Sequence, residues 1–333
     1  MEKNLTIWYL PMKHLGAHGF MDCKYLDPQL KALFCFGDQQ IFLPHVYRWC
    51  RRRRIPFVAY VGTAHSLDSN FKSKVMNALF AAGTLRIYKK NPVLAKTSAA
   101  KEELRQLGVP HAVIAPVGLD NAVLKKNIPA DEKMRLRKEH GFEADDVILC
   151  NVSRLSWEKR PLELIDLFLQ VKGKKKFKLI IVGNGPLEEE LNEKIRKNGL
   201  EKEVKIYPNV PYEKMWEIYE MSDYYLNMNK GEIFGMAIME AVYYKTSVAA
   251  IRALGPSVTL KDMKGHKLCE NDDEMAEWIT GPYPSEKDLQ ESSEKMAATF
   301  TWDRCADAFL QASSEKAAGK NRNSICQYGK SRV

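Results

Sequence analysis

The segment GEIFGMAIMEA follows an apolar, strand-like run and carries two glutamates separated by seven residues, Glu232 and Glu240. Gly235 is expected where a helix begins, because a residue without a side chain allows close approach to the backbone. The free amides of Met236 and Ala237 would then point outward, where the helix dipole favours an anion. One turn further on, the Glu240 carboxylate could accept hydrogen bonds from both hydroxyls of a ribose. The alternative is an ordinary helix with an acidic first turn.

A second polar segment, SRLSWEKRP, also stands between an expected strand and an expected helix. Its Arg154 and Lys159 are separated by a short loop, so both could converge on one point. A diphosphate leaving group needs positive charge where its negative charge develops, and these two cations could supply it without a metal. Two solvated surface cations are the alternative.

The sequence VGNGP, which contains Gly185, resembles the start of a dinucleotide fingerprint, but Glu188 stands where the third glycine should be. It could be only a tight turn between a strand and a helix. No D-x-D pair stands at the end of an expected strand to hold Mg²⁺ or Mn²⁺, since Asp272 and Asp273 precede a helix. We therefore expect neither a metal nor another cofactor.

The rest of the chain predicts a scaffold that brings such segments together. Short β-branched and aromatic runs alternate with longer helical patterns, and several runs are apolar throughout, as in parallel strands covered on both faces. Strands are expected over residues 5–10, 32–37, 57–62, 93–97, 112–116, 147–153, 178–183, 204–207, 224–227, 247–251 and 266–269, and helices over 161–171, 187–197 and 212–221. This alternation predicts an α/β protein with two Rossmann-like, doubly wound domains and a deep cleft between them, where ligands bind at the carboxyl ends of strands.

The length of 333 residues and the hydrophobic content of 45% suit two domains. A polar stretch over residues 118–146 separates the two sets of strands, so we place a hinge near residues 116–121. The expected domains cover residues 1–120 and 121–300, and the last residues, 319–333, are expected to form a flexible tail.

Charge and cysteine content limit the possible partners and the compartment. The net charge of +9 suggests an anionic partner, which could be a phosphate ligand, a membrane surface or a nucleic acid. Seven cysteines without a C-x-x-C pair argue against a zinc cluster or a disulfide framework and favour a reducing cytoplasm. The N-terminus lacks a signal-peptide pattern. The longest apolar stretch, residues 75–85, is far shorter than the ~20 residues that span a bilayer.

Taken in order, SRLSWEK, IVGNGP and EIFGMAIMEA resemble the C-terminal domain of the retaining GT-B-fold glycosyltransferases, the large family that includes sucrose synthase and many bacterial mannosyl- and glucosyltransferases. This match covers residues 147–279. Weaker similarities lie outside it. VIAPVGLD resembles the family's domain junction, AYVGTAHS its strand that ends in a histidine, and FTWDRCADAFL its closing helix, here residues 301–318, which crosses back onto the first domain.

The resemblance implies a retaining, metal-independent transferase that moves a sugar from a UDP- or GDP-linked donor to a glycan or lipid-linked acceptor, in cell-surface polysaccharide or glycolipid synthesis. Arg154 and Lys159 would hold the diphosphate, Glu240 the ribose and Glu232 the hydroxyls of the transferred sugar. Further site residues would be Phe234, Gly235, Met236 and Ala237 along the phosphate and sugar, Gly185, His65 from the other domain, and Gly16, which falls with Gly19 where the family has a glycine loop after the first strand. For His65, a buried histidine satisfied by backbone groups is the alternative.

The sequence departs from the family pattern in three places. Ile233 replaces the usual glycine between glutamate and phenylalanine, and YYKTSV lacks the glycine that precedes the next strand. The N-terminal domain is short, with little room for the usual extra strand and helix. The second possible function is therefore a donor-binding but catalytically weak scaffold or partner subunit.

A basic run, RWCRRRR, contributes Arg48, Arg51, Arg52, Arg53 and Arg54 around Trp49. A cationic amphipathic stretch follows at residues 70–90. Cations beside aromatic and apolar residues suit an anionic membrane surface, to which the protein would bind peripherally. A solvated helix end is the alternative. Nucleic-acid binding is not expected, because the chain contains no recognised nucleic-acid module.

Overall fold

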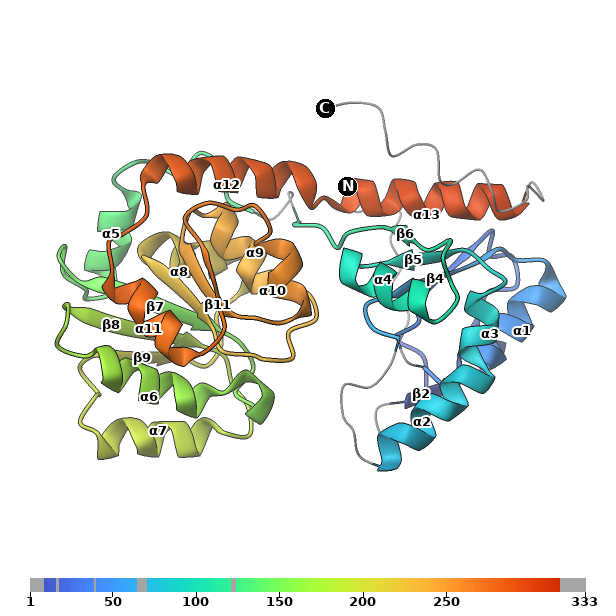
Figure 1. Ribbon diagram of the computed structural model, residues 1–333, viewed down its shortest axis with the longest axis horizontal. Helices are drawn as coiled ribbons and strands as arrows, with labels where there is room; N and C mark the ends of the chain where they lie inside the picture. Colours follow the sequence, from blue (N-terminus) through green and yellow to red (C-terminus); the bar gives the residue numbers. More distant parts are fainter. Residues whose placement is uncertain (1–8, 16–17, 39, 65–70, 121–123, 318–333) are drawn as a thin grey trace. The chain divides into compact units, whose positions relative to one another are not determined.

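The computed structural model describes residues 9–15, 18–38, 40–64, 71–120 and 124–317 (Figure 1). The chain divides into two compact units, Met1–Pro116 with Asp303–Val333, and Val117–Trp302. Each unit is built on its own parallel sheet, and every strand expected from residue 32 onward is present. The predicted α/β fold with parallel sheets is confirmed.

The sheet of the second unit has the strand order β12-β11-β10-β7-β8-β9. Its strands are β7 (Val147–Val152), β8 (Phe177–Val182), β9 (Val204–Tyr207), β10 (Tyr224–Asn227), β11 (Ser247–Ile251) and β12 (Lys267–Cys269). The chain runs outward from β7 to β9, returns to place β10 on the other side of β7, and continues to β12. This is the order of doubly wound nucleotide-binding sheets, in which the reversal between β7 and β10 is the topological switch point.

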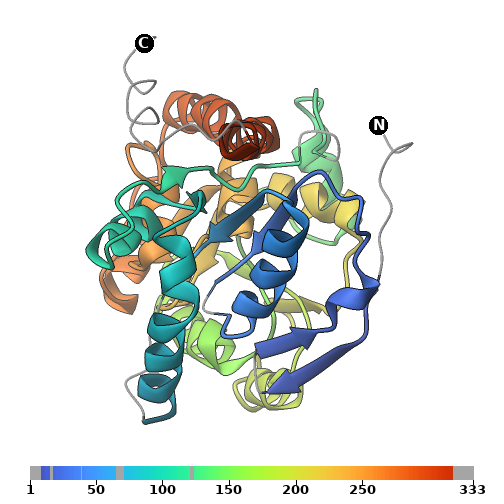
Figure 2. The same ribbon diagram turned by 90° about the vertical axis from the view of Figure 1, so that its right-hand side faces the viewer.

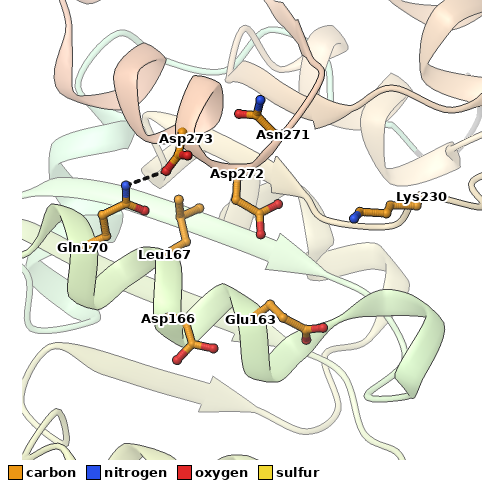
Figure 3. Close-up of a pocket in the computed structure, with 8 residues that line it drawn as sticks. All are labelled: Glu163, Asp166, Leu167, Gln170, Lys230, Asn271, Asp272 and Asp273. Carbon is orange, nitrogen blue, oxygen red and sulfur yellow. Dashed lines mark hydrogen bonds between the residues drawn. The ribbon is translucent and has the colours of Figure 1, made fainter.

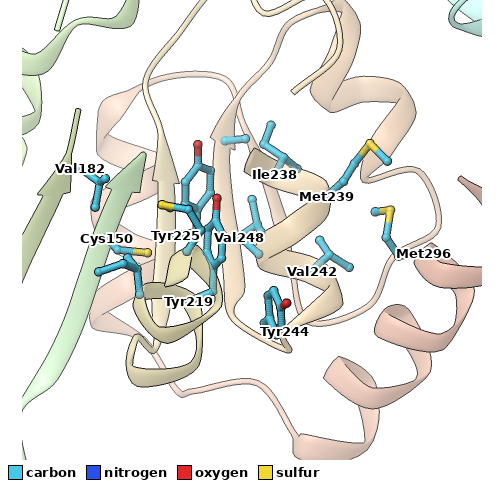
Figure 4. Packing of buried hydrophobic residues seen from close by; sticks show 14 of the residues in the cluster. Cys150, Val182, Tyr219, Tyr225, Ile238, Met239, Val242, Tyr244, Val248 and Met296 are labelled. Atoms are coloured by element: carbon cyan, nitrogen blue, oxygen red, sulfur yellow. The ribbon is translucent and has the colours of Figure 1, made fainter. Parts of the chain in front are cut away.

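Helices cover both faces of this sheet because successive strand residues point to opposite sides. Leu149, Leu179 and Ile181 pack in one core with α6 (Pro161–Val171), α7 (Glu188–Lys197) and α11 (Asp272–Thr280). The core on the other face, shown in Figure 4, joins Cys150, Val182, Tyr225 and Val248 to α8, α9 and α12. These three helices are Met215–Met221, Met236–Tyr243 and Glu286–Thr299. The site segments therefore stand on a sheet that is buried on both sides.

Local sequence fixes where several helices begin. Pro161 is the first residue of α6, where its missing amide costs nothing. The side chain of Asn271 accepts from the Glu274 amide at the start of α11, and Ser285 accepts from the Asp288 amide before α12. Such caps satisfy amides that have no partner within the helix.

The sheet of the first unit follows chain order, with β3 (Leu33–Phe36), β4 (Phe57–Val61), β5 (Val93–Ala95) and β6 (Val113–Ile114) side by side. Right-handed crossovers in a sheet of this order place the connecting helices on one face. One buried core accordingly holds residues of α1 (Leu43–Arg53), α2 (Phe71–Ala82), α3 (Thr84–Tyr88) and α4 (Ser98–Gln106).

The C-terminal helix α13 (Trp302–Ala317) covers the other face of that sheet (Figure 2). The ring of Phe309 lies 4.8 Å from that of Phe34 on β3, measured between centroids. The Cys305 thiol lies beside Tyr60 of β4. From Asp303 onward the helix belongs to the first unit. The end of the chain therefore completes a sheet whose own helices cover only one side.

The N-terminal segment differs from the expected strand and glycine loop. β1 (Met12–Leu15) and β2 (His18–Met21) form an antiparallel hairpin in which Gly19 pairs with His14. Strands separated by two residues pair antiparallel, because a parallel pair needs a long crossover. Of the expected strand over residues 5–10, Tyr9 and Leu10 are not in a strand. Residues 5–8 and Gly16 lie outside the described residues.

Two segments at the boundary of the second unit run side by side. The Leu119 amide donates to the Phe300 carbonyl at 3.0 Å, and Leu119 also forms a β-bridge with Thr301. A Cβ at Gly118 would lie 2.0 Å from the Trp302 nitrogen, so only glycine fits this crossing. The chain therefore passes from the first unit to the second, and back again, through these two paired segments.

Candidate functional site

The loops that follow β7 and β10 meet at the switch point. Lys159, from the first loop, pairs with Glu232, from the second, with Nζ 2.8 Å from Oε2. The two residues are 73 positions apart in the sequence, and adjacency of β7 and β10 brings them together. Crevices at such switch points are where open α/β sheets bind ligands. The structure therefore places one cation and one carboxylate of the expected site at that position.

Glu232 is held in its charged form although its side chain is only 15% exposed. The Asn229 side-chain amide donates to the same oxygen, Oε2, at 3.1 Å. Asn229 is itself fixed, because its Oδ1 accepts from the Gly231 backbone amide and its backbone amide donates to Oδ1 of Asn227. Burial raises the pKa of Glu232, but Lys159 and the asparagines outweigh it, and the pKa lies below its ordinary value. The two asparagines were missed from the sequence, although an N-x-N pattern at the end of a buried strand was visible.

Arg154 does not join Lys159 in this structure. Its guanidinium pairs with Glu158 one turn away, with an N–O distance of 2.8 Å, and its side chain is 70% exposed. The loop therefore directs Lys159 inward and Arg154 outward. The convergence expected from their spacing would require Arg154 to exchange Glu158 for another anion.

Gly185 holds two loops together by close backbone approach. The Leu155 amide donates to the Asn184 carbonyl at 2.9 Å, and the Leu155 carbonyl accepts from the Leu187 amide at 3.0 Å. A Cβ at Gly185 would lie 2.5 Å from that same Leu155 carbonyl oxygen. The loop that carries Lys159 is thus seated on the turn after β8. Gly185 therefore allows two backbone segments to pack closely, as expected if VGNGP forms a tight turn between a strand and a helix.

Helix α9 begins at Met236, four residues after Glu232. Gly235 precedes it with φ of 86°, a left-handed conformation that favours glycine. The amides of Met236 and Ala237 lie in the first turn, where a helix offers no internal acceptor and its dipole is positive. An anion such as a phosphate oxygen fits this position.

The residues that precede α9 pack against the core and against the next helix, α10 (Leu254–Thr259). The Phe234 ring is buried and its centroid lies 6.1 Å from that of Phe300, so the side chain belongs to the core. The Gly255 amide donates to the Glu232 carbonyl at 2.8 Å. A Cβ at Gly255 would lie 2.5 Å from the Phe234 nitrogen, so α10 packs directly on this loop. Both contacts fix the direction of the α9 N-terminus.

Glu240 is 7% exposed and accepts two hydrogen bonds from tyrosines. Tyr212 donates to Oε1 at 3.1 Å, and Tyr219 donates to Oε2 at 2.8 Å. Burial raises the pKa of Glu240 and the two hydroxyls lower it, leaving the pKa above its ordinary value. Neither tyrosine was predicted, because only the packing of α8 and of the turn after β9 brings them to α9.

The acidic pair Asp272–Asp273 lies in a separate groove between α6 and α11 (Figure 3). Arg160 forms two hydrogen bonds to Asp272, at 3.1 and 2.8 Å, and Asp273 accepts from Gln170 at 2.9 Å. Among the residues that the structure describes, no group of three or more His, Cys, Asp or Glu side chains could hold a metal ion. Asp272 and Asp273 instead form hydrogen bonds with Arg160 and Gln170.

The basic run forms the last turns of α1 and its left-handed cap, Arg54. Arg53 lies over the Trp49 ring, 4.6 Å from its centroid, and Arg48 donates to the Pro44 carbonyl. Arg51, Arg53 and Arg54 line one groove together with Lys31. Arg52 is exposed. Over the described part of the chain, no helix has the length and apolar character needed to cross a bilayer.

The carboxyl ends of the first unit's strands carry a second ion pair. Lys96, after β5, lies 3.0 Å from Asp38, after β3, and its ammonium group lies 5.4 Å from the Tyr60 ring centroid. The Ala64 amide donates to Glu103 at 2.8 Å. The neighbouring His65 lies outside the described residues. The sequence had not indicated Asp38 or Lys96.

Known proteins resemble this chain in sequence and in fold. Residues 132–296 match the family model "Glycosyl transferases group 1". D-inositol 3-phosphate glycosyltransferase of Mycobacterium avium is 26% identical, over 78% of this chain and 64% of that protein. Alpha-monoglucosyldiacylglycerol synthase of Streptococcus pneumoniae is 24% identical, over 41% of this chain and 32% of that protein. The chain thus spans less than two thirds of the length of these curated relatives.

Among solved structures, Anabaena HepE in complex with UDP and glucose superimposes with a TM-score of 0.65 at 19% identity, over 80% of this chain and 74% of that chain. This likeness extends across both units and concerns the fold. The chain has the fold of the GT-B glycosyltransferases, and residues 132–296 are similar to the domain of the glycosyl transferases group 1 family.

Proposed function

We propose that this protein is a glycosyltransferase that takes a sugar from a nucleoside-diphosphate donor. The observation that carries the proposal is the Lys159–Glu232 pair at the switch point, beside the positive end of α9. A diphosphate needs positive charge, and a sugar needs acceptors for its hydroxyls. The UDP and glucose bound to the related fold of HepE support the same ligand class.

In this proposal, the diphosphate, the transferred sugar and the ribose of the donor each have a partner in the second unit. Lys159, with Arg154 turned from Glu158, neutralises the diphosphate, and the amides of Met236 and Ala237 bind its oxygens. Glu232 accepts hydrogen bonds from the hydroxyls of the transferred sugar. The ribose hydroxyls donate to Glu240.

We further propose that transfer is metal-independent and retains the anomeric configuration. Lys159 and the α9 dipole provide the positive charge that a metal would otherwise supply. Glu232 already accepts from Lys159 and Asn229 on one oxygen, which disfavours it as an attacking nucleophile. The acceptor oxygen would instead attack from the side of the leaving group, while the departing diphosphate oxygen takes the acceptor's proton. An inverted product by NMR would contradict this route.

For the acceptor we propose a glycan or a lipid-linked sugar of cell-surface polysaccharide or glycolipid synthesis, reached at an anionic membrane surface. The similarity to the streptococcal synthase of a glucosylated diacylglycerol supports a lipid acceptor. Each arginine near an anionic leaflet contributes about 1 kcal/mol, and the attraction decays over roughly 8 Å at physiological salt. Wild-type protein should therefore sediment with anionic vesicles and be released by salt. Changing Arg51, Arg52, Arg53 and Arg54 together to Gln should abolish this, and equal sedimentation would contradict membrane binding.

The test of the function is the release of nucleoside diphosphate from UDP- and GDP-sugars, with and without lipid or sugar acceptors. A transferase releases more diphosphate when the right acceptor is present. Tight donor binding with no stimulation by any acceptor would instead support the catalytically weak scaffold. Failure to bind any nucleotide sugar would overturn both functions.

A further inference from the structure

We propose that Tyr212 is a gate on the ribose site, and that donor binding requires its hydroxyl to leave Glu240. This inference rests on the proposed function, because it assigns Glu240 to the ribose. In this structure the Tyr212 hydroxyl donates to Oε1 of Glu240 at 3.1 Å. A ribose hydroxyl approaching that oxygen would have to take the place of the tyrosine.

The space beside Glu240 is too small for a sugar while Tyr212 stays. It is lined by Leu124, Tyr212, Met215, Trp216, Tyr219, Glu240 and Tyr244 and has a volume of about 10 Å³. That is no more than a single water molecule requires. A ribose can therefore enter only if one of the lining side chains moves.

Tyr212 is better placed to move than the other groups around Glu240. Tyr219 and Tyr244 are 1% and 7% exposed, and their rings stack at 5.9 Å within the core shown in Figure 4. Met215 is 8% exposed. Tyr212 is 43% exposed and stands on a single 3-10 turn, Tyr212–Lys214, immediately after Pro211. Its ring can swing toward solvent without opening the core.

The two tyrosines therefore have different roles. A buried carboxylate needs hydrogen-bond donors, and Tyr212 and Tyr219 each supply one. Tyr219 is fixed in the core and keeps Glu240 oriented whether or not a ribose is bound. Tyr212 supplies the donor that a ribose hydroxyl replaces. Nucleotide binding therefore breaks the Tyr212–Glu240 hydrogen bond, and the cost of breaking it lowers the affinity for the nucleotide.

The test is calorimetric titration of UDP and GDP into the full chain and into single variants. Tyr212→Phe removes the competing hydroxyl but keeps the ring, and it should tighten nucleotide binding about fivefold, the value of one ordinary net hydrogen bond. Tyr219→Phe should weaken binding, because Glu240 loses its fixed partner. Tyr283→Phe is the matched control, since that hydroxyl donates to the Asp223 carbonyl before β10 and should leave affinity unchanged.

A second probe ties the effect to the ribose. Inorganic pyrophosphate has no ribose, so Tyr212→Phe should not change its affinity. Nucleotide affinity that is equal or weaker in Tyr212→Phe would overturn the gate and make Tyr212 part of the binding surface. A gain for pyrophosphate equal to that for UDP would also overturn it. Absence of binding by the wild type and all variants would overturn the proposed function itself, a result distinct from failure of the gate.

Discussion

Replacing Lys159 with Met should destabilise the protein in a pH-dependent manner. The pair with Glu232 is short, 2.8 Å, and the two side chains are 23% and 15% exposed. Exposed pairs contribute about 0–1 kcal/mol, whereas breaking a fully buried pair costs about 3–5 kcal/mol. This intermediate burial gives an expected loss of about 2 kcal/mol in the free energy of unfolding at pH 7.

The sign of the pH dependence follows from the opposing effects on Glu232. In the wild type its pKa is below the ordinary value near 4.5, so its stabilisation is present above that value and is lost as pH falls through the folded-state pKa. Burial is the largest single influence on this carboxyl group and raises its pKa. Without Lys159 the pKa should rise, and the variant's stability should fall as pH rises through it. The difference from wild type should therefore be largest at pH 7 and small at pH 4.

Urea unfolding followed by circular dichroism between pH 4 and 8 measures this difference. Lys159→Met, Glu232→Gln and the double variant form a cycle whose coupling at pH 7 should exceed about 1 kcal/mol. Lys264→Met is the matched control, because Lys264 pairs with Glu291 on the surface, where the two side chains are 65% and 45% exposed, and its loss should cost under about 1 kcal/mol. Equal losses for Lys159→Met at pH 4 and pH 7, or additive single effects, would refute the reasoning.

Three further predictions concern the loops and the chemistry. Arg154→Ala should change the unfolding free energy by under about 1 kcal/mol yet slow transfer. Arg160→Ala should cost about 2 kcal/mol, because it leaves the half-buried Asp272 without its partner. Urea unfolding and diphosphate release separate the two variants. Gly185→Ala should destabilise by more than about 2 kcal/mol, since its Cβ would meet the Leu155 carbonyl, and a thermal shift of under 2 °C would be inconsistent with this. Transfer should persist in EDTA, and full loss that Mn²⁺ restores would show that a metal is required.

The strands of the second unit could be predicted from the sequence because both of their faces are buried. The apolar runs at residues 204–207, 224–227 and 247–251 coincide with β9, β10 and β11. The start of α6 was equally predictable, because Pro161 marks it. Local composition carries this information, since it reflects burial and capping at each residue.

The relations within the site were less predictable, because they depend on contacts between distant segments. Phe234 and Gly185 were expected among the ligand-binding residues, and the structure adds that the Phe234 ring packs on Phe300 and the Gly185 backbone packs on Leu155. The two tyrosine donors to Glu240 come from the turn after β9 and from α8. A sequence motif identifies which residues are special without showing whether they contact the ligand or support those that do.

The first unit also shows the limit of local patterns. A sheet in chain order leaves Phe34 and Tyr60 on the face that its own helices do not cover. Phe309, 275 residues later in the chain, covers Phe34. In the hairpin, Gly19 is paired within a strand and lies in no loop before a helix. Both features depend on which segments pair, and hydrophobic periodicity does not specify that.

The central claim, a nucleotide-sugar site in the second unit, is tested most directly by calorimetric titration of UDP- and GDP-sugars into wild type, Glu240→Gln and Lys159→Met. Glu193→Gln, on the exposed side of α7, serves as the control. We predict saturable binding by wild type and the control to at least one nucleotide sugar. Loss of charge-assisted hydrogen bonds worth about 1.5–3 kcal/mol should weaken binding at least tenfold in both site variants. Equal affinity in all four proteins, or no binding by any, would contradict the claim.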